Sequence, residues 1–180
     1  MRPTFTRAAT ALAAAGLLAL AGCTTANTSP STQALHYKGG SFSDQKFDEC
    51  IAAGTRSYEG PGDRIYHYPV GQRTFSFRNK AEGSDADAVT IKTKDAQQMT
   101  VVGLVTFELT SDCERLRTFH EQIGLKYQAY FAEGADDSEG WSRFLTDYLL
   151  TPLNSTMDKA GLQQNWRTLY SSTEAVTAFE

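Results

Sequence analysis

The sequence predicts an α+β domain in which a mainly antiparallel, twisted sheet packs against two or three helices. Residues 88–109 alternate between apolar and polar side chains as two strands around a turn, and residues 64–78 show a similar pair. Apolar residues then recur at helical spacing in residues 111–124 and 141–160. The 180-residue chain is short enough for one domain, predicted over residues 48–170, and its 41% hydrophobic content suffices for a core.

The first 22 residues are predicted to be a secretory signal peptide. Arg2 and Arg7 form a positively charged start, and residues 8–21 are an uncharged run rich in Ala and Leu. Leu20-Ala21-Gly22-Cys23 resembles the lipobox of bacterial lipoproteins, in which the signal is cut before the cysteine and Cys23 receives acyl chains. The alternative is an ordinary signal peptide with an accidental cysteine. The resemblance implies a lipid-anchored protein of the cell membrane with its domain on the extracytoplasmic side. Each methylene of such acyl chains that is buried in the membrane contributes about 0.8 kcal/mol to membrane binding.

Residues 23–47 are predicted to be the acylated cysteine and a flexible tether. The stretch from Thr24 to Ser43 is rich in Thr, Ser, Gly and Asn, a composition that buries too little apolar area to offset the entropy of ordering. His36 falls in this stretch, so we expect it to be a solvated linker residue.

Cys50 and Cys113 remain once Cys23 is acylated, and an even pair in an exported protein favours a disulfide. Closing a loop of about 60 residues would stabilise the fold by roughly 4 kcal/mol in the chain-entropy model. The alternative is a redox-active or nucleophilic thiol, but the sequence contains no CxxC motif that would support it.

Residues 64–68 and 73–78 are predicted to form a hairpin around a turn at residues 69–72, where Pro and Gly favour a turn. Residues 89–93 and 99–109 are predicted to form the next antiparallel pair, with the later strand in the centre of the sheet and covered on both sides. Gly103 within it indicates a bulge or a close approach of another backbone.

Helical signals dominate the second half of the chain. Ser111 and Glu114 form a capping-box pattern, and Gly124 fits the left-handed position that ends a helix. The acidic residues 132–140 lack the ligand spacing of a calcium loop and fit the start of a helix over residues 141–160, which Pro152 should kink. Residues 164–170 are predicted to be a short strand, and residues 171–180 the start of a C-terminal helix.

The order of these parts resembles the stomatin/prohibitin/flotillin superfamily, whose shared domain is the SPFH or band-7 domain. The match is carried by Gly60-Pro61-Gly62, by Thr93-Lys94-Asp95 followed by the strand from Met99 to Leu109, and by the later stretch FLTDYLLTPLNSTMDKAG. Ala96 stands where the family's turn usually has Gly. The resemblance implies a non-catalytic, membrane-attached scaffold that self-assembles into homo-oligomers and organises membrane proteins or lipids.

The sequence offers no catalytic, cofactor-binding or metal-binding motif, so we predict no enzyme activity, cofactor or metal site. His36, His67 and His120 are not at metal-ligand spacing, and a convergence of Asp63, His67 and Ser76 has no motif behind it. With 17 basic against 21 acidic residues, nothing indicates nucleic-acid binding.

The rival hypothesis is a monomeric solute-binding or envelope-assembly lipoprotein with an unrelated α+β fold. Such a protein needs a concave pocket with a few convergent polar groups. Tyr58, Tyr66 and Tyr68 are the residues that could line one.

Overall fold

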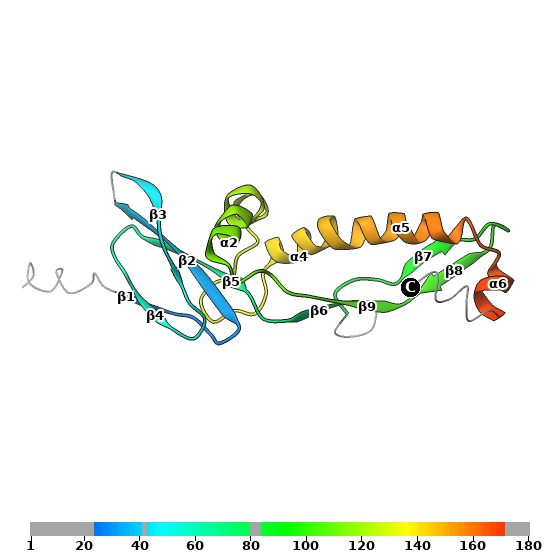
Figure 1. The fold of residues 1–180 in the computed structure, drawn as a ribbon, viewed down its shortest axis with the longest axis horizontal. Helices are drawn as coiled ribbons and strands as arrows, with labels where there is room; N and C mark the ends of the chain where they lie inside the picture. The colour runs from blue at the N-terminus through cyan, green and yellow to red at the C-terminus, as the bar shows by residue number, and fades with distance from the viewer. Residues whose placement is uncertain (1–23, 41–42, 80–83, 172–180) are drawn as a thin grey trace, which may run out of the picture. The chain divides into compact units, whose positions relative to one another are not determined.

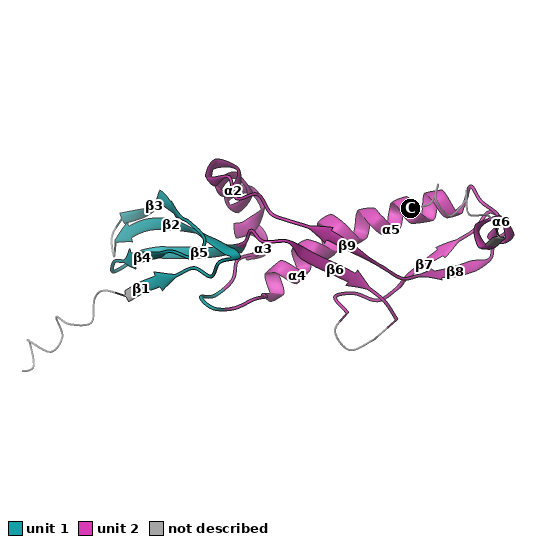
Figure 2. Cartoon of the chain, turned by 60° about the horizontal axis from the view of Figure 1, so that its bottom comes forward, with its two compact units in different colours: residues 1–68, 132–134 teal, residues 69–131, 135–180 magenta. Residues whose placement is uncertain are grey.

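A computed structural model describes residues 24–40, 43–79 and 84–171, and its architecture is α+β (Figure 1). The chain divides into two compact units where the sequence predicted one domain. Unit 1 contains the described residues up to Tyr68 together with Ala132–Gly134, and unit 2 contains Pro69–Phe131 and the residues from Ala135 onward (Figure 2). Residues 1–23, which include the signal peptide and Cys23, lie outside the described part of the chain.

Unit 1 is built from β-strands. Strands β1 and β4 pair antiparallel, and a second sheet has the order β3-β2-β5. The strands are β1 (Thr24–Asn27), β2 (Thr32–Gly40), β3 (Ser43–Ile51), β4 (Arg56–Glu59) and β5 (Arg64–Pro69).

The predicted flexible tether is wrong, because Thr24–Asn27 forms β1, Thr32–Gly40 forms β2, and β3 begins at Ser43. In β2 the consecutive residues Gln33 to Tyr37 are all buried, which gives this segment an apolar anchor despite its polar surroundings. The hydroxyl of Thr28 donates to the carbonyls of Ala52 and Thr55 at 2.7 and 2.9 Å. Hydroxyl side chains therefore satisfy the backbone here, a use that composition alone does not reveal.

The predicted hairpin of residues 64–78 is also wrong. Strand β5 lies in the sheet with β2, whereas β6 (Arg73–Phe77) pairs antiparallel with β9 (Gly103–Phe107). Both strands exist close to their predicted limits. The partner of each strand lies in a distant part of the sequence, and the alternation within a strand does not indicate which strand it pairs with.

Strands β7 (Val89–Lys92) and β8 (Gln98–Val101) form the predicted antiparallel pair. The turn between them is fixed by Thr93, whose hydroxyl donates to the carboxylate of Asp95 at 2.5 Å, while the backbone N–H of Gln97 donates to that hydroxyl at 3.1 Å. The hydrogen bond from Thr93 lowers the pKa of Asp95. The turn predicted from sequence is confirmed.

The predicted central strand of residues 99–109 divides into β8 and β9 at Val102, and these two strands have different partners. The alternation is confirmed, because Met99, Val101 and Val105 pack on the core. The predicted cover on both sides is wrong. Gly103 is required by a close approach, since an added Cβ would lie 2.7 Å from the Phe77 ring.

The helices follow the predicted apolar stripes, with shifted ends. Asp112 caps the first helix by accepting from the N–H of Arg115 at 2.9 Å, in place of Ser111. The helix continues through Gly124 and ends at Gln128, which has a φ of 56°. Its parts are α2 (Cys113–Phe119), the π-helical η2 (His120–Gly124) and α3 (Leu125–Tyr127).

The second long helical run comprises α4 (Glu139–Leu145), the π-helical η3 (Thr146–Leu150) and α5 (Thr151–Gly161). Pro152 lies in the first turn of α5, immediately after the π-helical turn. Such a turn accommodates a residue that lacks an N–H donor, and the kink expected at Pro152 stays a prediction.

The strand predicted at residues 164–170 is wrong, because Trp166–Ser171 forms helix α6. The backbone N–H of Trp166 donates to Asp95 at 3.2 Å, and those of Thr168 and Leu169 donate to the Asn165 carbonyl at 3.0 and 3.1 Å. These bonds start a helix that the short apolar pattern did not distinguish from a strand. The predicted C-terminal helix start lies, beyond residue 171, outside the described residues.

The core of unit 2 forms where both helical runs meet the strands. Trp141 contacts the rings of Phe107, Phe131 and Phe144 at centroid distances of 6.3, 5.6 and 5.3 Å. The fully buried members of this cluster are Phe75, Phe77, Val89, Ile91, Ala129, Phe131, Trp141 and Leu145.

Replacing Ala96 with glycine is expected to stabilise the protein by about 0.5–1 kcal/mol. Ala96 has a φ of 58°, a left-handed conformation that costs a residue with a Cβ roughly 1–2 kcal/mol. Part of this gain is lost to the greater unfolded-state entropy of glycine. Thermal and urea unfolding measure the change, and Ala52→Gly in an exposed loop is the matched control, expected to destabilise slightly. Equal effects of the two substitutions would contradict the strain at Ala96.

Candidate functional site

The three residues considered for catalysis have separate partners. Asp63 accepts hydrogen bonds from His36, Gly39 and Gly60, whereas the hydroxyl of Ser76 donates to Asp85 at 2.9 Å. His67 is buried in β5, and burial lowers its pKa. These hydrogen bonds do not link the three residues to one another.

The three tyrosines do not share one surface. Tyr58 is 78% exposed, whereas Tyr66 and Tyr68 are buried. Tyr66 packs edge-on against Tyr37 with ring centroids 5.7 Å apart, and its hydroxyl donates to Gln45 at 3.4 Å. Two of the three therefore belong to the interior of unit 1 and cannot line an open pocket with Tyr58.

Cys50 at the end of β3 and Cys113 at the start of α2 are both disulfide-bonded cysteines. The acidic segment after residue 131 has structural roles. Glu133 accepts from the N–H of Asn27 at 2.9 Å, and Ser138 caps α4 by accepting from the N–H of Trp141 at 3.1 Å. Glu139 then lies in the first helical turn, where negative charge is favourable, as predicted.

An uncharged row of side chains follows the outward face of β8 and β9. Thr100, Val102, Leu104 and Thr106 alternate with the core-facing residues, and we call this row the β8–β9 row. Val102 is 58% exposed and Leu104 is 60% exposed. Two large apolar side chains thus stand next to each other on the row, with no charged residue among its four members.

A cavity of about 710 Å³ opens beside Val102 and Leu104, and both residues contribute to its lining. The lining also includes Leu153, Met157 and Ala160 of α5. Apolar side chains therefore project next to an apolar hollow. A surface of this kind offers both halves of a contact between copies of one chain.

The strands below the β8–β9 row have open edges. Among the described residues, β6 pairs with β9 and β7 pairs with β8, each as a two-stranded ribbon. In the described part of the chain β7, β8 and β9 consequently each have one edge without a strand partner, whereas the second edge of β6 bonds to Asp85 and Ala86. Unpaired edges are templates for pairing with another chain.

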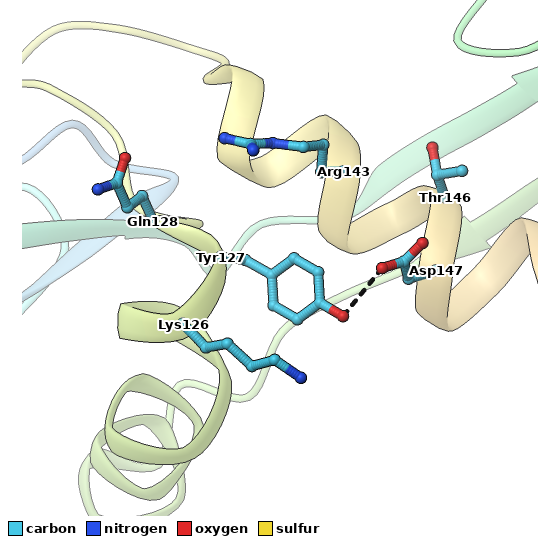
Figure 3. Close-up of a pocket in the computed structure, with 6 residues that line it drawn as sticks. All are labelled: Lys126, Tyr127, Gln128, Arg143, Thr146 and Asp147. Atoms are coloured by element: carbon cyan, nitrogen blue, oxygen red, sulfur yellow. Dashed lines mark hydrogen bonds between the residues drawn. The ribbon is translucent and has the colours of Figure 1, made fainter.

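A second, polar hollow of about 490 Å³ lies between α3 and the α4–η3 run (Figure 3). The hydroxyl of Tyr127 donates to Asp147 at 2.9 Å, which raises the pKa of Tyr127. Lys126, Gln128, Arg143 and Thr146 complete the lining. Its two cations could hold a small anionic group.

His36 differs most from its predicted environment. It is 2% exposed in β2, where a solvated linker residue was expected, and its Nε2 lies 3.0 Å from Asp63. Its other ring nitrogen faces Asp48 and Glu49 of β3. The apolar residues Ala34, Leu35 and Tyr37 around His36 are the sequence signal for a buried strand that composition obscured.

No family model matches this chain, and no curated protein matches its sequence. Among the described residues, no helix has the length and apolar character required to cross a membrane.

Proposed function

We propose that this chain is a lipid-anchored, non-catalytic scaffold of the SPFH type that self-assembles at the membrane and organises other membrane proteins or lipids. The anchor is acylated Cys23, as the lipobox resemblance implies. The α+β architecture and the hydrogen-bonded turn from Thr93 to Gln97 fit the resemblance. The fold alone would suit many functions, so the proposal depends on a surface that can assemble.

The observation that carries the proposal is the exposure of Val102 and Leu104 in an uncharged row above open strand edges. Burying one such side chain contributes about 1.5–3 kcal/mol, so a contact between copies through this row gains several kcal/mol from these two residues. Contiguous exposed apolar groups of this kind mark interaction surfaces. We therefore place the self-association contact at the β8–β9 row.

Substituting Leu104 with lysine is expected to dissociate the assembly. The variant places a charge in the contact, and its desolvation opposes association. Wild-type and variant chains, extracted from membranes in mild detergent, are compared by light scattering. Leu125→Lys is the matched control, because Leu125 is also on unit 2 and is 47% exposed on α3.

Loss of the large species in Leu104→Lys alone supports the β8–β9 row as the contact. Identical masses for wild type and both variants contradict it. Circular dichroism of each variant shows that a lower mass does not arise from unfolding.

The second candidate is a monomeric solute-binding lipoprotein, favoured by the polar hollow that contains Lys126 and Arg143. A thermal-shift screen of small anions tests it, because a ligand that binds the folded state raises the unfolding temperature. A shift that disappears in Arg143→Gln, in a protein that is monomeric by light scattering, would favour this candidate over the scaffold.

A further inference from the structure

His36 is held by a carboxylate on one side of its ring. Its Nε2 lies 3.0 Å from Oδ2 of Asp63, in the turn before β5. The same carboxylate accepts the backbone N–H groups of Gly39 at 3.0 Å and Gly60 at 2.9 Å. Asp63 is 10% exposed, so this arrangement is largely shielded from solvent.

The hydrogen bonds of Asp63 decide which ring nitrogen of His36 carries hydrogen. Oδ1 of Asp63 accepts from the N–H of Gly39 and Oδ2 accepts from the N–H of Gly60, so both oxygens act as acceptors, as those of a carboxylate do. An ionised carboxylate only accepts hydrogen bonds, and His36 Nε2 must therefore be the donor. In the neutral imidazole this leaves a lone pair on Nδ1.

That lone pair faces two further carboxylates. Nδ1 of His36 is buried and has no hydrogen-bond partner. It lies 3.7 Å from Oδ2 of Asp48 and 3.8 Å from Oε1 of Glu49. Three electron-rich atoms thus converge. Lys38 Nζ lies 2.9 Å from the Asp48 oxygen, and a cation placed between all three atoms would offset their mutual repulsion more fully.

A β-bulge produces this convergence. His36 is in register with Glu49, and the next residue, Tyr37, is in register with Phe47, so Asp48 is the additional residue of β3. In a regular strand Asp48 and Glu49 would point to opposite faces. The bulge directs both toward His36, which is a common role of bulges.

We propose that His36 Nδ1, Asp48 and Glu49 form a binding site for a divalent cation of the zinc class, with Asp63 orienting the histidine. Imidazole and carboxylate together are ligands that Zn²⁺ accepts, at about 2.0–2.2 Å. The three ligand atoms lie within 4.8 Å of one another, and tetrahedral coordination needs a separation of about 3.4 Å, so small side-chain rotations close the site. A histidine whose second nitrogen donates to a carboxylate is the usual arrangement at zinc sites.

Lys38 is the competitor for this site. Its Nζ lies 2.9 Å from Oδ2 of Asp48, the same oxygen that faces His36, and its side chain is 62% exposed. Glu49 also accepts from the hydroxyl of Ser57 at 3.1 Å. The exposed lysine can swing into solvent when a cation binds, and we expect its removal to tighten binding.

The test uses the full-length chain in detergent, stripped with EDTA and titrated calorimetrically with Zn²⁺. Wild type is expected to bind one ion. Asp48→Asn and Glu49→Gln should each weaken binding by about tenfold or more. Lys38→Gln should strengthen it several-fold. Asp44→Asn, an exposed carboxylate on the same strand, is the matched control and should leave the affinity unchanged.

Histidine NMR supplies a readout that a folding defect does not imitate. Zinc should shift the Nδ1 resonance of His36 to the metal-bound range while Nε2 keeps its proton. The proposal is overturned if Zn²⁺ does not bind, or if Asp48→Asn, Glu49→Gln and Asp44→Asn bind it equally well. It is also overturned if both ring nitrogens of His36 carry protons when Zn²⁺ is in excess.

Discussion

Replacing Trp141 with alanine is expected to destabilise unit 2 by about 3–5 kcal/mol, the usual cost of truncating a large buried aromatic residue. Trp141 is 2% exposed and contacts three phenylalanine rings, from β9, the loop before α4 and α4 itself. No neighbouring side chain can fill the space, because the interior is close-packed. Urea unfolding followed by circular dichroism measures the loss.

Trp166→Ala is the control for this prediction. Trp166 is 38% exposed on α6. Among the described residues its one aromatic contact is with Tyr170, at a centroid distance of 6.2 Å. We expect its truncation to cost about 1 kcal/mol or less. Equal costs for the two tryptophans would contradict the assignment of Trp141 to the centre of the core.

Acid is expected to destabilise the protein between about pH 6.5 and pH 4 through His120. Burial lowers the pKa of His120 from 6.5 to about 4, and the side chain is 1% exposed. The unfolded chain therefore takes up a proton at a higher pH than the folded chain does. The stability is fully present above the unfolded pKa and is lost as pH falls toward the folded one, by on the order of 3 kcal/mol at most. His67, whose pKa burial also lowers, adds a loss of the same sign.

The measurement is the free energy of unfolding by urea at a series of pH values. His120→Gln removes the titrating group, so its stability should fall less steeply over the same interval, whatever its stability at neutral pH. Parallel curves for wild type and His120→Gln would contradict the role of His120.

The elements that the sequence predicted correctly are those whose signal is local. Residues 88–109 alternate because one face packs on a core, and Thr93 and Asp95 fix the turn by hydrogen bonds within four residues. The two helical runs follow from apolar spacing. Pro152 lies in the first turn of α5, where its missing N–H is tolerated.

The errors arise where partners are distant in sequence. The segment from Thr24 to Ser43 reads as a tether because Thr and Ser dominate it, yet Thr28 uses its hydroxyl to bond the backbone at Ala52 and Thr55. Strands β5 and β6 were predicted at the right residues with the wrong partners. Nothing within residues 64–78 indicates that β5 pairs with the earlier strand β2 and that β6 pairs with the later strand β9.

The cluster at His36 could not have been found from spacing. Asp48 and Glu49 are adjacent in sequence, and adjacent strand residues normally face opposite sides. Only the bulge opposite Tyr37 brings both to His36, and Asp63 reaches the ring from a separate turn. By contrast, the alternation along the β8–β9 row was predicted from the sequence, but its outer residues were expected to be covered, and Val102 and Leu104 are exposed.

The most direct test of the scaffold proposal is the mass of the wild-type, lipid-anchored protein extracted from membranes in mild detergent, measured by light scattering over a range of concentrations. A soluble version for comparison must begin no later than Thr24, since a later start removes β1 and then β2. The proposal predicts a large, defined oligomer that Leu104→Lys reduces to smaller species. A monomer at every concentration, with and without the lipid anchor, would contradict it.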